Sequence, residues 1–239
     1  MIRLQQLNIS DSDDDTFHSI VMDTFDTACS TKVRIGGKYI PNCFAMDGQK
    51  YVCMDELMMD VKNHKCVVYS FGIGSDWTFE NTMASFGCKV YAYDHTIHPP
   101  KFVPDNITFA NIGLSDVPYE NDDDLKTLSQ IIEENGHTDT KISYLKMDIE
   151  GTELHGLPMW LDSGSFANVQ QIAIEYHLRG VQDYLRDDFL KALRDLHTKE
   201  DFRIFSWEAN NCFYSGRSDL YYELAEIVLK KVTGTTNCI

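Results

Sequence analysis

The chain has 239 residues, of which 43% are hydrophobic and 24% are charged, enough for one sizeable hydrophobic core. Its 21 basic and 37 acidic residues give a formal net charge of −16, which repels nucleic-acid phosphates and anionic lipids, so no nucleic-acid or membrane partner is expected. No apolar run approaches the roughly 20 residues of a membrane-spanning helix, and no signal-peptide core precedes the acidic residues 11–15, so the chain as written is expected to be soluble and cytoplasmic.

The first part of the chain, residues 1–65, is predicted to form a small cap before the main domain. An acidic run can cap a helix over residues 16–29, whose apolar side chains recur on one face. Residues 33–40 are predicted to form a hairpin that turns on the Gly36-Gly37 pair, and a further glycine turn leads into a strand at residues 50–53.

The main domain, residues 66–239, opens with a strand, a glycine turn and a helix. The short apolar run Val67–Phe71 is typical of a strand buried on both faces. It ends at Gly72 and Gly74, and an amphipathic helix is predicted over residues 76–86. Such a turn brings bare backbone and a helix N-terminus close to a ligand, which indicates a pocket for a nucleotide or for S-adenosylmethionine (SAM).

The next predicted strand, Lys89–Tyr93, ends in Asp94, which lies 22 residues after Gly72. An acid at about this distance beyond the turn binds the ribose hydroxyls in doubly wound folds. The alternative for Asp94 is to cap the start of the following segment, a common use of aspartate after a strand.

Strand and helix patterns alternate through the rest of the chain, and the order predicts an α/β fold of Rossmann-like, doubly wound type. Its sheet is expected to have seven mostly parallel strands and to end in an antiparallel C-terminal hairpin. The remaining elements, in order, are a strand at 107–110, a turn at 113–116, a helix at 122–135, a strand at 142–147, a helix at 152–161, a strand at 171–176, a helix at 184–197 and an antiparallel pair at 202–207 and 221–229.

Polar residues follow three of the predicted parallel strands: Asp94, then Asp148 and Glu150, then His177. In open α/β sheets, ligands bind at the carboxyl ends of the strands near the point where strand order reverses. These residues therefore indicate a site at this edge of the sheet.

Two segments carry a family resemblance. Residues 68–75 and, above all, Leu145-Lys-Met-Asp-Ile-Glu-Gly-Thr-Glu153 resemble the class I, SAM-dependent methyltransferases. The second string is similar to the fourth-strand signature of FkbM-type methyltransferases, and residues 47–55 look closer still to the animal methyltransferase-like relatives of that group. The likeness covers about residues 29–180.

The resemblance implies a SAM cofactor and assigns roles by position. Gly72 and Gly74 would approach the amino-acid moiety of SAM, and Asp94 would bind its ribose. Ser70, also assigned to the cofactor, stands where most members carry an acid, and Asp76 stands where a third glycine is usual. The positions that would hold the adenine are Ile112, Gly113, Leu114 and Ser115.

Asp148, Glu150 and His177 would face the methyl group and the acceptor. His177 is the candidate general base, because imidazole titrates near neutral pH, and Asp148 would position the acceptor and border the cofactor. As alternatives, the two acids could serve only the start of the next helix or hold a divalent metal through oxygens, and His177 could be a structural histidine. No residue is assigned as a metal ligand.

The leading hypothesis is a SAM-dependent methyltransferase (class EC 2.1.1) that methylates an oxygen of a small molecule or a glycan. A second hypothesis is a non-catalytic protein of the same fold that binds a ligand or partner. A nicotinamide dehydrogenase ranks last, because Trp77 occupies the third position of Gly-x-Gly-x-x-Gly. Neither the acceptor nor the oligomeric state is predicted.

Seven cysteines are scattered along the chain without a Cys-x-x-Cys pair, so no structural zinc site is expected. Their odd number and apolar surroundings favour buried free thiols of a reducing compartment. A disulfide among Cys29, Cys43 and Cys53 is the less favoured alternative. An N-terminal leader or anchor, if one was trimmed, would instead place the protein in the secretory pathway.

Overall fold

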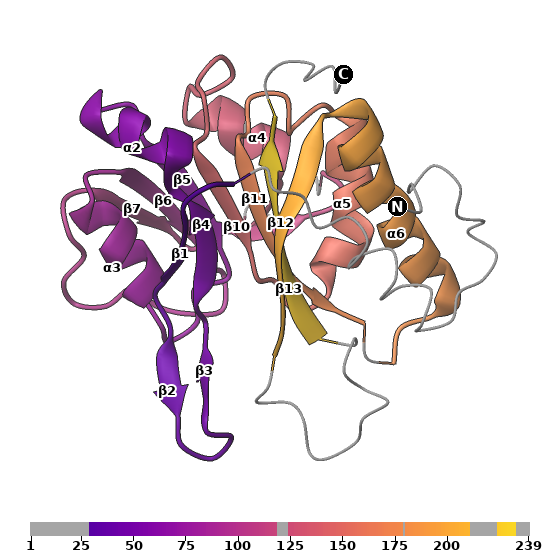
Figure 1. Cartoon of the computed structure of the whole chain (residues 1–239), viewed down its shortest axis with the longest axis horizontal. Coiled ribbons are helices and arrows are strands. Elements are labelled where there is room, and N and C mark those ends of the chain that lie inside the picture. The colour runs from indigo at the N-terminus through magenta and orange to yellow at the C-terminus, as the bar shows by residue number, and fades with distance from the viewer. Residues whose placement is uncertain (1–28, 119–123, 179, 211–223, 233–239) are drawn as a thin grey trace.

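A seven-stranded sheet forms the centre of the molecule in the computed structural model, which describes residues 29–118, 124–178, 180–210 and 224–232 (Figure 1). The helix predicted at residues 16–29 lies outside this part of the chain. The strand order is β12-β13-β11-β10-β5-β6-β7. The strands are β5 (Val67–Phe71), β6 (Lys89–Tyr93), β7 (Ile107–Ala110), β10 (Tyr144–Met147), β11 (Gln171–His177), β12 (Phe202–Ala209) and β13 (Leu224–Lys231).

The direction of the strands confirms the predicted doubly wound fold. Strands β5, β6, β7, β10 and β11 run parallel to one another, whereas β13 is antiparallel to both β11 and β12. The strand order reverses between β5 and β10, because the chain first builds outward from β5 through β6 to β7 and then returns to β10 on its other side. This reversal places the carboxyl ends of β5 and β10 next to each other.

Helices cover both faces of the sheet and bury two separate apolar cores (Figure 1). One core includes apolar side chains of α4, α5 and α6, and the other includes those of α2 and α3. In the part of the chain that the structure describes, no helix combines the length and the apolar character that crossing a membrane requires. The helices are α2 (Met54–Lys62), α3 (Thr78–Ser85), α4 (Leu128–Glu134), α5 (Thr152–Asp162) and α6 (Asp183–Lys199).

The segment before α2 forms a two-part ribbon, and the predicted hairpin at residues 33–40 is wrong. Strand β1 (Lys32–Ile35) pairs with β4 (Lys50–Cys53), and β2 (Lys38–Ile40) pairs with β3 (Ala45–Asp47), all antiparallel. The Gly36-Gly37 pair bends the chain between β1 and β2 with φ of 74° and 89° but does not reverse it. The reversal comes after β2, and the strand predicted at 50–53 is confirmed.

Two further sequence predictions need correction. The predicted turn at 113–116 contains strand β8 (Gly113–Ser115), which pairs in parallel with β9 (Leu125–Thr127). Helix α4 consequently begins at Leu128 and not near residue 122, with Thr127 and Gln130 forming a capping box at its start. Helix α2 was not predicted from the sequence.

The expectation of free thiols is wrong for the described cysteines. Disulfides join Cys29 to Cys53 and Cys66 to Cys88, and Cys43 is disulfide-bonded as well. Cys66 and Cys88 each precede one of two neighbouring parallel strands, β5 and β6, that pair in register from their first residues. Their Cα atoms therefore lie only 4.6 Å apart, within the range that a disulfide can bridge.

Candidate functional site

A cavity of about 250 Å³ opens at the carboxyl ends of β5, β6 and β10, and we call it the cofactor-side cavity. It brings together eight of the residues singled out from the sequence. These are Gly72, Gly74, Asp94, Ile112, Gly113, Leu114, Asp148 and Glu150.

The glycine turn after β5 is shaped by the close approach of β10. Gly72 has a φ of 74°, and a Cβ atom there would lie 1.7 Å from the backbone oxygen of Asp148. Gly74 also has a positive φ, of 56°, but a Cβ atom there would meet nothing within 4 Å. The first glycine is thus required by packing inside the protein, and the second leaves open space beside the backbone for a ligand.

Asp94 holds this turn in place. One carboxylate oxygen accepts hydrogen bonds from the backbone N–H groups of Ile73 and Gly74, both at 2.8 Å. The other accepts from the backbone N–H and the hydroxyl of Thr96, at 2.8 and 2.6 Å. Burial opposes ionisation of this carboxyl group, but these hydrogen bonds outweigh it and lower the pKa of Asp94. Its contact with ribose stays a prediction, since four donors already engage both oxygens.

Two of the residues assigned to the cofactor lie behind the wall of this cavity. Ser70 is fully buried and donates to Glu80 on α3 at 2.6 Å. Glu80 thus places a carboxylate beside Ser70, the position in β5 where most class I methyltransferases carry an acid. Ser115 is also buried, and its hydroxyl donates to the backbone oxygen of Val117. Neither serine lines the cofactor-side cavity.

A second cavity, the acceptor-side cavity, lies across Asp148 from the first. The two cavities share Gly72, Ile73, Asp148 and Glu150 in their walls. The acceptor-side cavity also contains Glu175, His177 and Asn210, together with residues of the β3–β4 bend and of α3. Asp148 is therefore placed where a group held in one cavity meets a group held in the other.

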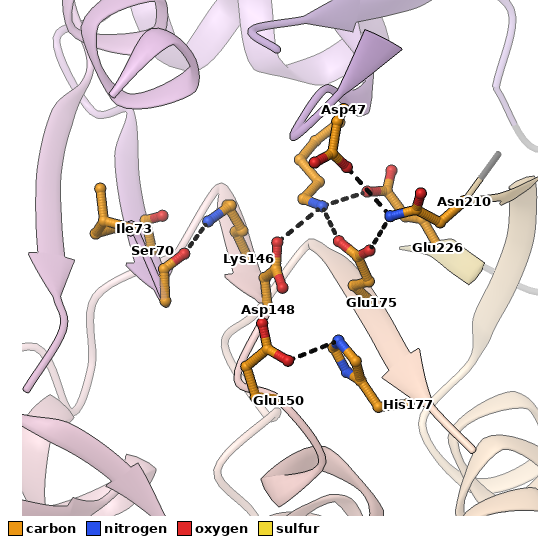
Figure 2. Close-up of polar contacts among 12 residues, drawn as sticks. Asp47, Ser70, Ile73, Lys146, Asp148, Glu150, Glu175, His177, Asn210 and Glu226 are labelled. Atoms are coloured by element: carbon orange, nitrogen blue, oxygen red, sulfur yellow. Dashed lines mark hydrogen bonds and ion pairs between the residues drawn. The ribbon is translucent and has the colours of Figure 1, made fainter. Parts of the chain in front are cut away.

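Two carboxylates of the acceptor-side cavity, Asp148 and Glu175, share a buried lysine, Lys50, with a third carboxylate. The Lys50 ammonium lies 3.3 Å from Asp148, 3.0 Å from Glu175 and 2.8 Å from Glu226. Figure 2 shows these three carboxylates converging from β10, β11 and β13 on one ammonium group. Asn210 completes the network by donating to Glu175 at 2.9 Å and to Asp47 at 3.1 Å.

Burial and the shared cation set the ionisation of this network. Burial raises the pKa of Asp148 to about 6, against the charge of Lys50, and likewise raises the pKa of Glu226 to about 7. Burial also acts on Glu175, but Lys50 and a hydrogen bond with Asp148 outweigh it and lower that pKa. Desolvation opposes the charge on Lys50, yet the carboxylates raise its pKa. Lys50 thus remains a cation, and Asp148 titrates close to neutral pH.

His177 has an acid beside each ring nitrogen. Its Nδ1 is 2.9 Å from the fully buried carboxylate of Glu153, and its Nε2 is 3.5 Å from exposed Glu150. Burial disfavours the charged imidazole, but the hydrogen bond to Glu153 and the charge of Glu153 outweigh it and raise the pKa of His177 to about 9. At neutral pH the ring is therefore a cation whose Nδ1–H donates to Glu153, and Figure 2 shows its other contact, with Glu150.

Asp148, Glu175 and His177 also form a group that could hold a metal ion, because one ligand atom of each lies within 4.8 Å of the others. Two of these three residues, Asp148 and Glu175, already form ion pairs with the Lys50 ammonium. The positive charge that a metal would supply is thus present as a side chain of the protein.

The sequence analysis missed Lys50, Glu175, Glu226 and Asn210. The two glutamates had a signal in the sequence, because each is an acid with apolar neighbours on both sides within its strand, β11 or β13. Such a residue is rarely buried without a partner. Lys50 gave no comparable signal, since a lysine at the first position of a short strand is ordinary.

Comparison with known proteins gives three findings. A family model described as "Methyltransferase domain" matches residues 9–222. Two curated relatives, both named "Probable methyltransferase-like protein 24", are 27% identical (Homo sapiens) and 28% identical (Rattus norvegicus) over 176 residues. These matches cover 64% of this chain and 46% or 47% of the relatives, so the chain spans about half the length of the curated relatives it matches.

Among solved structures, Sp1610 of Streptococcus pneumoniae in complex with S-adenosyl-L-methionine is similar at 15% sequence identity and a TM-score of 0.38. The match covers 76% of this chain and 75% of that protein.

Proposed function

Because this chain belongs to the family of methyltransferase domains, whose cofactor is SAM, we propose that it methylates a hydroxyl oxygen of a small molecule or a glycan. The observation that carries the proposal is the position of Asp148. It lies in the shared wall of the cofactor-side and acceptor-side cavities, and its pKa is raised to about 6 by burial. A methyl donor in one cavity and a hydroxyl in the other would meet at this carboxylate.

The residues around the cofactor-side cavity fit SAM. The open space beside Gly74 and the backbone of the glycine turn can accept its amino-acid end. Ile112, Gly113 and Leu114 offer a mostly apolar wall for its adenine. Bound SAM supplies a methyl group activated by a sulfonium charge.

We assign the proton transfer to Asp148 and not to His177. A base must be unprotonated near the working pH, and Asp148 ionises as the pH rises through about 6, whereas His177 with a pKa of about 9 stays protonated. The Asp148 carboxylate would accept the proton of the acceptor hydroxyl, and SAM, when bound, would supply the methyl group to that oxygen. The His177 cation, fixed by Glu153, then orients the acceptor and stabilises the ionised form of Asp148.

Replacing Asp94 with alanine is expected to weaken SAM binding by about 10- to 100-fold, because the glycine turn loses a charged acceptor of its backbone N–H groups. Calorimetric titration of the purified protein with SAM measures this. Asp105→Ala, which removes an exposed acid that lines none of the cavities, is the control and should bind as the parent does. Well-folded parent protein that fails to bind SAM would remove the basis of the proposal, and binding without turnover on any acceptor would favour a non-catalytic binding protein.

We also propose that the protein works in an oxidising compartment such as the secretory pathway, since stable disulfides form there and are rare in the cytosol. In protein made through a secretory route, Cys29, Cys53, Cys66 and Cys88 should resist alkylation in denaturant until a reductant is added. Peptide mass spectrometry measures the labelling of each cysteine. Complete labelling of these four without reductant would contradict the proposal.

A further inference from the structure

A third cavity, of about 190 Å³, continues from the acceptor-side cavity, and we call it the outer chamber. The two share four wall residues, Asp47, Gly48, Glu175 and Asn210. The cofactor-side cavity, the acceptor-side cavity and the outer chamber thus form one path. An acceptor whose reacting atom lies at Asp148 would extend into the outer chamber if it is larger than a single ring.

One wall of the outer chamber is the β2–β3 end of the ribbon, which projects from the body of the molecule in Figure 1. This wall supplies Phe44 and Met46, and Phe44 is 84% exposed. An exposed aromatic ring in the wall of a polar chamber offers an apolar surface on which the C–H face of a ligand's saturated ring can pack.

Two buried side-chain oxygens in the walls of the acceptor-side cavity and the outer chamber accept no hydrogen bond from the described residues. The Oε1 atom of Gln49 is buried in the wall of the outer chamber and has no hydrogen-bond partner among the described residues. The Oδ2 atom of Asp76 is in the same condition in the acceptor-side cavity. A buried acceptor without a donor costs free energy, so a ligand that brings O–H donors to both positions would be favoured.

The charges of the outer chamber disfavour an anionic ligand. Four carboxylates, of Asp47, Glu175, Glu208 and Glu226, line it together with two cations. Both cations are already paired, Arg34 with Glu208 at 2.7 Å and Lys50 with the buried carboxylates. Phosphorylated or sulfated acceptors would therefore meet unbalanced negative charge.

We propose that the outer chamber binds the non-reacting sugar units of a neutral oligosaccharide whose terminal unit is methylated at Asp148. Resting on the proposed function, the proposal names the acceptor class as a glycan of at least two units. One sugar donates hydroxyls toward Asp76 and Asp148 in the acceptor-side cavity. The next sugar donates to Gln49 and packs its C–H face on Phe44.

The test uses the full chain and an array of neutral di-, tri- and tetrasaccharides, with sulfated sugars and alkyl amines printed alongside. We expect neutral oligosaccharides to bind, and Phe44→Ala and Gln49→Leu each to reduce that binding about tenfold. Phe102→Ala removes another exposed phenylalanine (77% exposed) that lines none of the three cavities, and it should leave binding unchanged. All three variants should retain the SAM affinity of the parent.

The proposal would be overturned if the protein preferred the sulfated sugars or the amines. It would also be overturned if neither Phe44→Ala nor Gln49→Leu weakened oligosaccharide binding. Two outcomes separate it from the proposed function. Chamber-dependent oligosaccharide binding by a protein that transfers no methyl group would uphold the chamber and reject the methyltransferase activity. Methyl transfer to single-ring hydroxyl compounds by a protein that binds no oligosaccharide would do the reverse.

Discussion

Replacing Lys50 with methionine should lower the free energy of unfolding at pH 7 by about 3–5 kcal/mol, because it leaves buried carboxylates without their cation. The ammonium is the shared partner of Asp148, Glu175 and Glu226, and the lysine side chain is 2% exposed. Methionine fills most of the same volume, so the loss reports on charge more than on packing. Chemical denaturation measures it.

The loss should depend on pH in a defined direction. Without the cation, the pKa values of Asp148 and Glu226, already raised by burial, rise further above their values in the unfolded chain, and Glu175 loses the main interaction that lowers its pKa. Groups of this kind leave the folded state most stable at low pH, where they are protonated, and stability falls as the pH rises through the folded pKa values. The difference between the parent and Lys50→Met should therefore be small near pH 4 and large near pH 8.

The matched control is Lys126→Met, which removes the cation of a surface pair with Glu134, a residue 54% exposed. Solvent screens that pair, so a change below about 1 kcal/mol is expected. Equal losses in the two variants, or a Lys50→Met loss that does not vary with pH, would show that the carboxylate network does not depend on Lys50.

The same substitution should move the pH dependence of methyl transfer. In the parent, the rate is expected to rise as the pH passes through about 6, the pKa of Asp148. In Lys50→Met this rise should shift to higher pH, so activity is lost at neutral pH and recovered under alkaline conditions. Asp148→Asn should be inactive across the range, whereas a rate that still rises near pH 6 in that variant would assign the base elsewhere.

Among the glycines that the structure describes, Gly72 is the one at which replacement by alanine is expected to be most damaging. The new Cβ atom would lie 1.7 Å from the Asp148 backbone oxygen, at a φ of 74°. Overpacking of this kind costs about 1–3 kcal/mol, and the left-handed backbone adds about 1 kcal/mol for any residue other than glycine. Relief requires the ends of β5 and β10 to separate, which also disturbs the cofactor-side cavity.

Gly164→Ala is a close control for this experiment. Gly164 has a φ of 73°, but a Cβ atom there meets nothing within 4 Å. The free energy of unfolding of Gly164→Ala should fall only by the backbone contribution of about 1 kcal/mol, and this variant should keep the parent's affinity for SAM. If the two variants unfold at the same denaturant concentration, the contact with Asp148 does not constrain the turn.

Several strands were predictable from local pattern alone. The runs at 67–71, 89–93 and 107–110 are apolar, rich in β-branched and aromatic residues and bounded by glycine or polar residues, and the strands β5, β6 and β7 have these bounds. The edge of the sheet at which the candidate site lies was predictable from the same pattern, because parallel strands that alternate with helices place their carboxyl ends together.

The pairing of the N-terminal ribbon was not predictable in the same way. A Gly-Gly pair is compatible both with a tight reversal and with a bend that lets two strands continue. What decides between them is a tertiary contact, because a Cβ atom on Gly36 would lie 2.7 Å from the backbone nitrogen of Phe79 on α3. The role of Lys50 escaped prediction for a similar reason, since its partners lie on strands 98 to 176 residues away along the chain.

Strand β13 occupies the centre of one half of the sheet, between β11 and β12, although both of these precede it in the chain. As the protein leaves the ribosome, β11 and β12 emerge first and must stay apart until residues 224–231 have been made. Until then, the exposed edge of β11 is open to pairing with the wrong strand. Glu226 lies on this late strand, so the Lys50 network can be completed only after β13 has been inserted between β11 and β12.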